Sequence, residues 1–295
     1  MSTVSFPGLG LTFELNRVAF SIGNFHIYWY GVIIAIGFVL AALFCCRQSK
    51  KFGVKSDDIV DILLFAAPCG IVGARIYYII FNPSLYFGAD GHLDLKACVN
   101  VHNGGLAIYG GIIVGVFVAF LVIRFKKLPF PPVIDVYAFG FLIGQMIGRW
   151  GNFVNVEAFG RETTLPWRMG IEKTVDGVTK YMEVHPTFLY ESLWNLLGFC
   201  VLLLVLYKGW RKFDGMIFLL YVAWYGLGRG FIEGLRTDSL YFFSTGFRTS
   251  QLVGFASCAV AVLLILRNLS RHPKPEQLYV NRQQSEGKDG KPQQP

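Results

Sequence analysis

Residues 27–46 read IYWYGVIIAIGFVLAALFCC, twenty residues in succession without a charged side chain. A run of this length and composition matches the roughly 20 residues that a helix needs to cross a hydrocarbon core of about 30 Å. The sequence therefore predicts an all-α fold, a polytopic transmembrane helical bundle of about seven spans. The apolar runs that define these spans lie at about 27–46, 59–81, 105–123, 133–153, 187–207, 215–233 and 251–266.

The overall composition also indicates a membrane protein. Of the 295 residues, 54% are hydrophobic and 16% are charged, and the mean hydropathy is +0.47. A soluble domain is usually about a quarter charged. The net charge of +8 does not indicate a nucleic-acid partner, because the basic residues lie between apolar runs rather than in one patch. The six cysteines contain no CxxC pair, which argues against a zinc site or a disulfide framework.

The positions of the basic residues predict the orientation. Sixteen of the 27 Lys and Arg residues lie in the C-terminal tail and in the loops after the first, third and fifth spans, and eight lie on the opposite side. Cytoplasmic loops carry the excess of Lys and Arg in membrane proteins, so we expect an outer N-terminus and a cytoplasmic C-terminus. The first 26 residues do not have the pattern of a cleavable signal peptide.

This topology divides the chain into two expected parts. We expect residues 1–270 to form a transmembrane domain that contains any functional site, with outer-face segments at about 82–104 and 154–186. Residues 271–295 are polar, and we expect them to be a disordered cytoplasmic tail.

Three basic residues lie within the apolar spans: Arg75, Arg149 and Arg229. An arginine at membrane depth costs roughly 2.5–3.5 kcal/mol on insertion scales, so it normally faces protein or water and serves a purpose. For Arg75 the sequence leaves a structural and a functional role equally open. The neighbours of Arg149 and Arg229 favour a functional role for both.

Arg149 lies in residues 148–160, which read GRWGNFVNVEAFG. If the fourth span remains helical there, Arg149 and Asn152 are three residues apart and share a face. Polar side chains that include Glu157, set among glycines such as Gly160, are typical of a lined cavity. Glycine lets a ligand approach the backbone, and arginine offers a planar fork that matches phosphate.

Arg229 belongs to a stripe on the sixth span. Tyr225, Arg229 and Glu233 recur every four residues and therefore lie on one face of a helix. Glu233 can pair with Arg229 and offset its burial. That pair alone is compatible with a structural role, but phosphate binding would explain why two separate spans each supply a guanidinium.

Two further segments contain candidate site residues. His185 stands at the outer entrance of the fifth span, where an interfacial and a functional role are equally open, and Glu191 lies just inside the same apolar run. Tyr109 lies between glycines in residues 103–111, which read NGGLAIYGG. It is either an anchor at the membrane interface or part of a site.

Together these segments resemble bacterial prolipoprotein diacylglyceryl transferases. Residues 148–160 are similar to that family's signature, G-R-x-G-N-F-x-N-x-E-x-x-G. The resemblance covers the chain from about Phe20 to Leu266. The other segments that match, in the same order, are 104–111, 185–191, 225–236 and Trp29-Tyr30-Gly31.

The resemblance implies a reaction in the bacterial cytoplasmic (inner) membrane, with the active site toward the outer leaflet. The diacylglyceryl group of phosphatidylglycerol moves to the lipobox cysteine thiol of a prolipoprotein, a thioether forms and glycerol phosphate leaves. No metal, soluble cofactor or nucleic acid is implied. The residues implied to be catalytic are Arg149, Arg229, Tyr109 and Glu233, and those implied to bind phosphatidylglycerol are Arg149, Asn152, Glu157, Gly160, Tyr30, Tyr225, Glu191 and His185.

The chain departs from a familiar form of the family at Tyr109, where many members have histidine. The thiolate is the nucleophile and a free cysteine has a pKa of about 8.5, so the reaction needs a proton acceptor. A free tyrosine, with a pKa of about 10, is a poor base unless cations favour its phenolate. Two interpretations stay open: Tyr109 is the base, or it donates a hydrogen bond while Glu191, Glu233 or water takes the proton. His102 stands at a different position and is not treated as the missing histidine.

Two other classes of protein are compatible with buried arginines. A transporter or channel for a small organic anion often shows internal repeats, and the two halves of this sequence show none. A metal-dependent lipid phosphotransferase would need clustered aspartates, and the spans offer mainly the isolated Asp61 and Asp135. The sequence favours the transferase over both.

Overall fold

The computed structural model of the protein describes residues 2–23, 25–86, 92, 94–100, 104–175, 178–237 and 248–289. The chain divides into two compact units, each with its own packed interior. The larger unit consists of Met1–Cys45 and Ile134–Pro295, and the smaller unit of Cys46–Val133.

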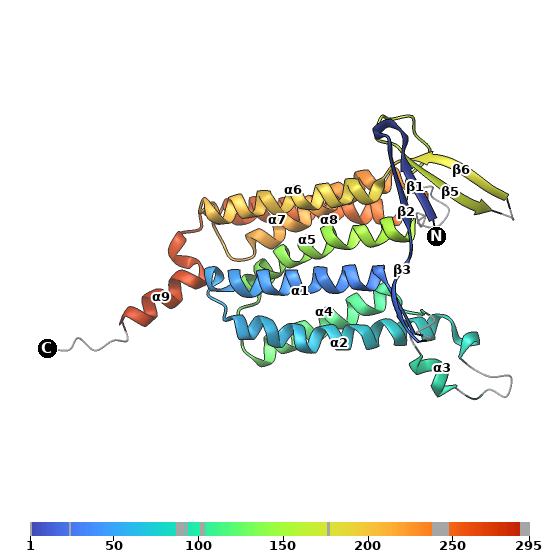
Figure 1. The fold of residues 1–295 in the computed structure, drawn as a ribbon. Coiled ribbons are helices and arrows are strands. Elements are labelled where there is room, and N and C mark those ends of the chain that lie inside the picture. Colours follow the sequence, from blue (N-terminus) through green and yellow to red (C-terminus); the bar gives the residue numbers. More distant parts are fainter. Residues whose placement is uncertain are drawn as a thin grey trace. The chain divides into compact units, whose positions relative to one another are not determined.

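The long helices follow the predicted spans and confirm the polytopic helical fold (Figure 1). Within the described residues, six helices are long and apolar enough to cross a membrane, and α7, Met216–Glu233, takes the place of the remaining predicted span. Arg229, Glu233 and several Gly, Tyr and Trp residues lower the mean hydropathy of α7. Every predicted boundary lies within three residues of a helix end. The six helices are α1 (Trp29–Ser49), α2 (Ser56–Phe81), α4 (Ile108–Phe125), α5 (Phe130–Asn155), α6 (Thr187–Tyr207) and α8 (Thr249–Leu269).

The structure also contains strands, which the all-α prediction omitted. Four of them form an antiparallel sheet in the order β2-β1-β5-β6, and β3 and β4 form a separate hairpin. The strands are β1 (Ser2–Phe6), β2 (Leu11–Leu15), β3 (Val18–Ile22), β4 (Phe25–Tyr28), β5 (Met169–Val175) and β6 (Val178–Val184). The shorter helices are η1 (Pro7–Leu9), η2 (Lys50–Phe52), η3 (Pro83–Leu85), α3 (Leu95–Val99), η4 (Pro275–Gln277) and α9 (Tyr279–Asp289).

The four-stranded sheet packs on the ends of α5 and α6. Along β1, Val4 and Phe6 are buried while Ser5 between them is not, as expected for a strand with one covered face. Val4 pairs with Ile171 of β5, so the first strand joins a hairpin that lies far along the chain. The buried residues of this core are Val4, Phe6, Met169, Ile171, Val184 and Phe188 of α6, and Phe153 of α5 packs against them.

Close helix packing in the smaller unit depends on glycines. A Cβ at Gly70 of α2 would lie 3.2 Å from the carbonyl oxygen of Gly111 and 3.7 Å from the Cα of Gly115, both on α4. The spacing of Gly111 and Gly115 therefore brings two backbones together, as small residues do between membrane helices.

Arg75, on α2 in the smaller unit, has a structural role. Its side chain is buried, and each of its five N–H groups donates to a backbone carbonyl at 2.7–2.9 Å. The ring of Tyr86 lies 5.1 Å from the guanidinium carbon. Arg75 thus ties α2 to the end of α3 and to the segment before α4, which decides between the two roles that the sequence left open. The accepting carbonyls belong to Ala97, Cys98, Asn100, Gly104 and Gly105.

In the larger unit, two tryptophans join α6 to α7. The rings of Trp194 and Trp224 stack with centroids 4.5 Å apart, and each indole N–H donates to the backbone carbonyl of the other residue at 2.9 Å. On the other side of α7, a Cβ at Gly226 would lie 2.5 Å from the carbonyl oxygen of Gly254 on α8. Helix α7 is therefore fixed on both sides, and with it the position of Arg229.

Part of the polar tail has helical structure. Between residues 271 and 289 the chain forms η4 and α9. Leu278 is buried, and the backbone N–H of Tyr279 donates to a carboxylate oxygen of Asp214 at 2.8 Å, which ties the start of α9 to the segment before α7. Residues 290–295 lie outside the described part of the chain.

The start of α7 depends on a buried carboxylate of α5. Asp135 is fully buried, and its two oxygens accept the backbone N–H groups of Gly215 and Phe218, both at 2.8 Å. Arg211 approaches the same carboxylate at 3.8 Å. The side chain therefore satisfies two donors that a helix start leaves without partners of its own.

We expect Asp135→Ala to lower the Tm in detergent by roughly 5–10 °C. A buried donor without a partner costs about 1–3 kcal/mol, and this substitution leaves the N–H groups of Gly215 and Phe218 without their acceptor. The control is Asp61→Ala, since Asp61 pairs with Lys126 through a side chain that is 43% exposed. Such a pair contributes at most about 1 kcal/mol. Equal Tm values for the two variants would contradict the capping role of Asp135.

Candidate active site

Helix α5 continues through most of the glycine-rich signature segment. It ends at Asn155, so Arg149 and Asn152 lie on one face as predicted, and Arg149 Nη1 donates to Asn152 Oδ1 at 3.3 Å. Asn152 Nδ2 in turn donates to Glu157 Oε1 at 2.8 Å. The amide of Asn152 thus connects the arginine to a carboxylate beyond the end of the helix.

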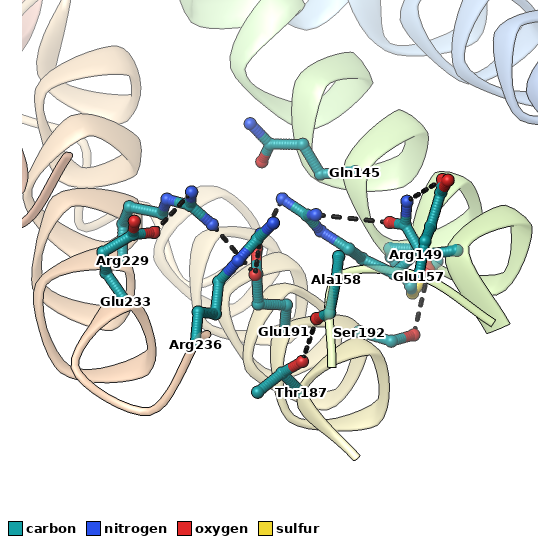
Figure 2. A network of polar contacts seen from close by, with 12 residues as sticks. Gln145, Arg149, Glu157, Ala158, Thr187, Glu191, Ser192, Arg229, Glu233 and Arg236 are labelled. Carbon is teal, nitrogen blue, oxygen red and sulfur yellow. Dashed lines mark hydrogen bonds and ion pairs between the residues drawn. The ribbon is translucent and has the colours of Figure 1, made fainter. Parts of the chain in front are cut away.

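Glu191 lies at the centre of the polar cluster (Figure 2). Its side chain is 4% exposed, and its Oε2 atom lies 2.5 Å from Arg149 Nη2. Its Oε1 atom lies 3.0 Å from Nη1 of Arg229 and 3.5 Å from Nη1 of Arg236. One carboxylate of α6 therefore faces guanidinium groups from α5, from α7 and from the segment after α7.

Arg229 has a second carboxylate partner. Glu233, four residues later on α7, lies with Oε2 2.6 Å from Arg229 Nη2, which confirms the predicted pair. The side chain of Glu233 is 2% exposed, and its backbone carbonyl accepts a hydrogen bond from Arg248 at the start of α8. Arg229 is therefore held between carboxylates of two helices, Glu191 and Glu233.

Among the described residues, the ion pairs of this cluster join three arginines, Arg149, Arg229 and Arg236, to the carboxylates of Glu191 and Glu233. The side chains of Arg149 and Arg229 are 19% and 18% exposed, whereas those of Glu191 and Glu233 are buried. The groups of the cluster that a ligand can reach are therefore mainly the guanidinium groups, which bind anions.

The segment after α5 brings Arg236 to the cluster. Gly160 pairs with Arg236 in an antiparallel bridge, and the Arg161 N–H donates to the Leu235 carbonyl at 2.8 Å. A Cβ at Gly160 would lie 2.7 Å from the Cβ of His185, so only glycine fits between these backbones.

Two residues of this segment have strained backbones. Val156 and Ala158 have positive φ angles of 53° and 56°, which are uncommon for residues other than glycine. The hydroxyl of Thr187 donates to the carbonyl of Ala158 and holds this conformation in place (Figure 2). Strain of this kind persists only where the surroundings enforce it, and it concentrates at functional sites.

Tyr30 and Tyr225 lie beside the cluster. A Cβ at Gly151 would lie 2.5 Å from the Tyr30 ring, so the absence of a side chain lets α1 approach α5 there. The Tyr225 ring stacks on Tyr221 at 5.9 Å between centroids, and the Tyr221 hydroxyl accepts a hydrogen bond from Gln145 at 2.9 Å. The side chain of Tyr225 thus lies on an aromatic layer one helical turn before Arg229.

His185 has contacts of a different kind. Its Nδ1 atom lies 3.2 Å from the hydroxyl of Tyr190, which also accepts a hydrogen bond from Trp167 at 2.8 Å. Burial and the neighbouring Arg161 hold the pKa of His185 below its usual value. Its backbone accepts the Gly160 N–H at 2.9 Å, so His185 supports the signature segment through its main chain.

Tyr109 belongs to the smaller unit, whereas the arginine cluster belongs to the larger one. It is the second residue of α4, and its side chain is 56% exposed. Residues 101–103, which include His102 and the start of the predicted NGGLAIYGG segment, lie outside the described residues.

Sequence reasoning missed Arg236 and counted it only as a basic residue of an outer loop. Helix spacing could not have found it, because α7 ends at Glu233 and Arg236 reaches the cluster through its bridge to Gly160. The sequence identified Glu191 as a candidate site residue but did not indicate its role. Nothing in the neighbouring residues shows that three arginines from separate segments meet at this carboxylate.

Comparisons with known proteins agree with the predicted family. Residues 17–267 match the family model described as prolipoprotein diacylglyceryl transferase. A curated protein of Finegoldia magna is 43% identical over 253 residues, which cover 86% of this chain and 96% of that protein. One from Lactobacillus delbrueckii subsp. bulgaricus is 40% identical over 270 residues, 90% of this chain and 95% of its own length. Both are named phosphatidylglycerol–prolipoprotein diacylglyceryl transferase. This chain therefore belongs to the prolipoprotein diacylglyceryl transferase family.

Proposed function

We propose that the protein transfers the diacylglyceryl group of phosphatidylglycerol to the cysteine thiol of a prolipoprotein lipobox, the first step of bacterial lipoprotein maturation. The observation that carries this proposal is the cluster in which Arg149 and Arg229, from two helices, share the buried carboxylate of Glu191. The guanidinium groups of Arg149 and Arg229 are partly exposed, and their planar N–H groups suit a phosphodiester, which carries one negative charge.

The same geometry suits the chemical step. The cysteine sulfur attacks the glyceryl carbon next to the phosphate, the carbon–oxygen bond breaks, and its electron pair leaves with glycerol phosphate. The leaving phosphate gains negative charge, so preorganised guanidinium groups stabilise the transition state more than the ground state. Glu191 and Glu233 keep Arg149 and Arg229 in place before the lipid arrives, which supports catalytic roles for both arginines.

The lipid head group has further candidate partners around the arginines. Asn152 and Glu157, linked by a hydrogen bond, offer polar atoms beyond the end of α5. Gly160 packs against His185 and Leu235, which brings its segment to the cluster, and Tyr30 and Tyr225 lie on helices beside the cluster. We place the glycerol hydroxyls of the head group among these residues.

Thiol activation releases a proton. The carboxylates of Glu191 and Glu233 are 4% and 2% exposed and already face arginines, so we assign them the task of positioning guanidinium groups. Tyr109, at the position where many family members have histidine, is exposed and can donate a hydrogen bond through its hydroxyl. We assign the proton to water rather than to a buried carboxylate.

The location follows from the charge distribution. The positive-inside rule places the loops after the first, third and fifth spans in the cytoplasm, with the N-terminus outside. The arginine cluster and the β5–β6 hairpin are then at the outer leaflet of the bacterial cytoplasmic membrane. A prolipoprotein that has crossed the membrane presents its cysteine on that side.

The direct test is mass spectrometry of a lipobox peptide incubated with the purified protein and phosphatidylglycerol vesicles. We expect the peptide mass to rise by one diacylglyceryl group and glycerol phosphate to appear in equal amount. A peptide with serine in place of the cysteine should stay unchanged, because its hydroxyl is a much weaker nucleophile. If folded protein gave no adduct on the cysteine peptide, the proposed function would be wrong.

Arg149→Ala should lower kcat by about 10²–10³, the cost of removing one preorganised donor from a developing anion. Arg149→Lys should fall between this variant and the parent, because lysine keeps the charge and loses the planar fork. Arg124→Ala is the control, since Arg124 is an exposed residue in the last turn of α4. Parental thioether formation by Arg149→Ala would refute the role of this arginine.

Replacements of Tyr109 distinguish a hydrogen bond from general-base catalysis. We expect Tyr109→Phe to lower kcat about 10-fold through loss of one hydrogen bond, and Tyr109→His to stay within about 3-fold of the parent. The histidine variant should also gain a kinetic ionisation near pH 6.5, which the parent lacks. Tyr109 would be only a packing residue if the phenylalanine variant matched the parent in kcat.

A further inference from the structure

The edge of β6 that faces away from β5 is paired along only part of its length. The segment of residues 160–163 pairs with the last residues of β6 and with His185 just after it. Gly160 N–H donates to the His185 carbonyl at 2.9 Å, His185 N–H to Arg161 at 3.0 Å, and Thr163 N–H to Glu183 at 2.9 Å. These bonds form a short antiparallel ladder that begins at the signature segment.

The ladder ends at Thr163 while β6 extends further. Successive backbone groups of a strand point to opposite edges, so Tyr181 presents its N–H and carbonyl to the same edge as Glu183. Strand β6 is the last in the sheet order, and among the described residues no strand pairs with it beyond Thr163. A hollow of about 620 Å³ lies here, between residues 162–164 on one side and 180–183 on the other.

We propose that this edge binds the extended segment that follows the reacting cysteine of the polypeptide substrate, as an added antiparallel strand. The inference rests on the proposed function. In this mode main-chain hydrogen bonds provide the affinity, which lets one enzyme accept prolipoproteins of different sequence. The hollow is lined by charges of both signs, including Glu162, Lys180 and Glu183, so it suits a polar peptide rather than an acyl chain.

The direction of the ladder fits this occupant. Residues 160–163 run away from the arginine cluster, because Gly160 pairs with Arg236, and they run antiparallel to β6. A substrate that continues the ladder in the same sense has its N-terminal end on the side of the cluster, next to Thr163, and its C-terminal end toward the tip of the β5–β6 hairpin. That hairpin extends beyond the ends of α5 and α6 (Figure 1). The cysteine at the start of the segment is thus directed to the site, and the rest of the substrate away from it.

The test is an N-methyl scan of the lipobox peptide on the unmodified protein. Each residue after the cysteine is N-methylated in turn, and the KM for the peptide is measured by thioether formation at saturating phosphatidylglycerol. We expect alternate positions to raise KM about 10-fold and the positions between them to change it less than about 3-fold, because only every second residue donates to the edge.

A flat profile, or one that only declines with distance from the cysteine, would overturn strand addition while the unmethylated adduct still supports the transferase function. Absence of that adduct would instead count against the proposed function itself. The two failures are therefore distinct.

A pair of variants tests the protein side. Tyr181→Pro removes the outward N–H at an edge, where proline is tolerated, and Tyr181→Ala removes the side chain but keeps that N–H. We expect the proline variant to have a peptide KM about 10-fold above that of the alanine variant, with the same KM for phosphatidylglycerol in both. Equal peptide KM values in folded proteins would contradict pairing at Tyr181.

Discussion

The buried carboxylate of Glu191 is the interaction on which the site depends. Alone in an apolar helix bundle it would be costly, and so would each arginine that faces it. Contact with Arg149, Arg229 and Arg236 offsets those costs, and Glu233 adds a second anion to the set. The cluster forms only when α5, α6, α7 and the segment after α7 are all in place. The site is therefore complete only when these four segments of the larger unit pack together.

Other contacts in the larger unit hold these helices and segments in position relative to one another. The reciprocal indole bonds of Trp194 and Trp224 fix α6 against α7. Asp135 fixes the start of α7 from α5. Beyond the end of α5, the close approach at Gly160 joins the signature segment to the residues before α6 and after α7. Strained backbone at Val156 and Ala158 persists because these neighbouring contacts enforce it.

Local rules predicted part of this arrangement. The spans were predictable because hydrocarbon thickness sets a length that can be read from one segment at a time. The Arg149–Asn152 and Arg229–Glu233 contacts were predictable because they follow helix spacing. The convergence at Glu191 was not, because it joins separate helices. The strands were missed for the same reason, since β1 pairs with β5 across most of the chain and its five residues give a weak signal by themselves.

Arg75 and Arg149 show why an arginine within an apolar run does not by itself mark a binding site. Both lie in membrane-spanning helices, so the free-energy cost of inserting each into the membrane is about the same. All five N–H groups of Arg75 donate to backbone carbonyls, so none is left for a ligand. Arg149 instead faces a carboxylate and an amide, and its side chain stays 19% exposed. When backbone carbonyls accept from every N–H group of a guanidinium, no donor is left for a ligand. A carboxylate shared among several arginines instead holds each guanidinium in place and leaves part of it exposed. The partner of an intramembrane arginine, more than its depth, therefore decides whether it can bind a substrate.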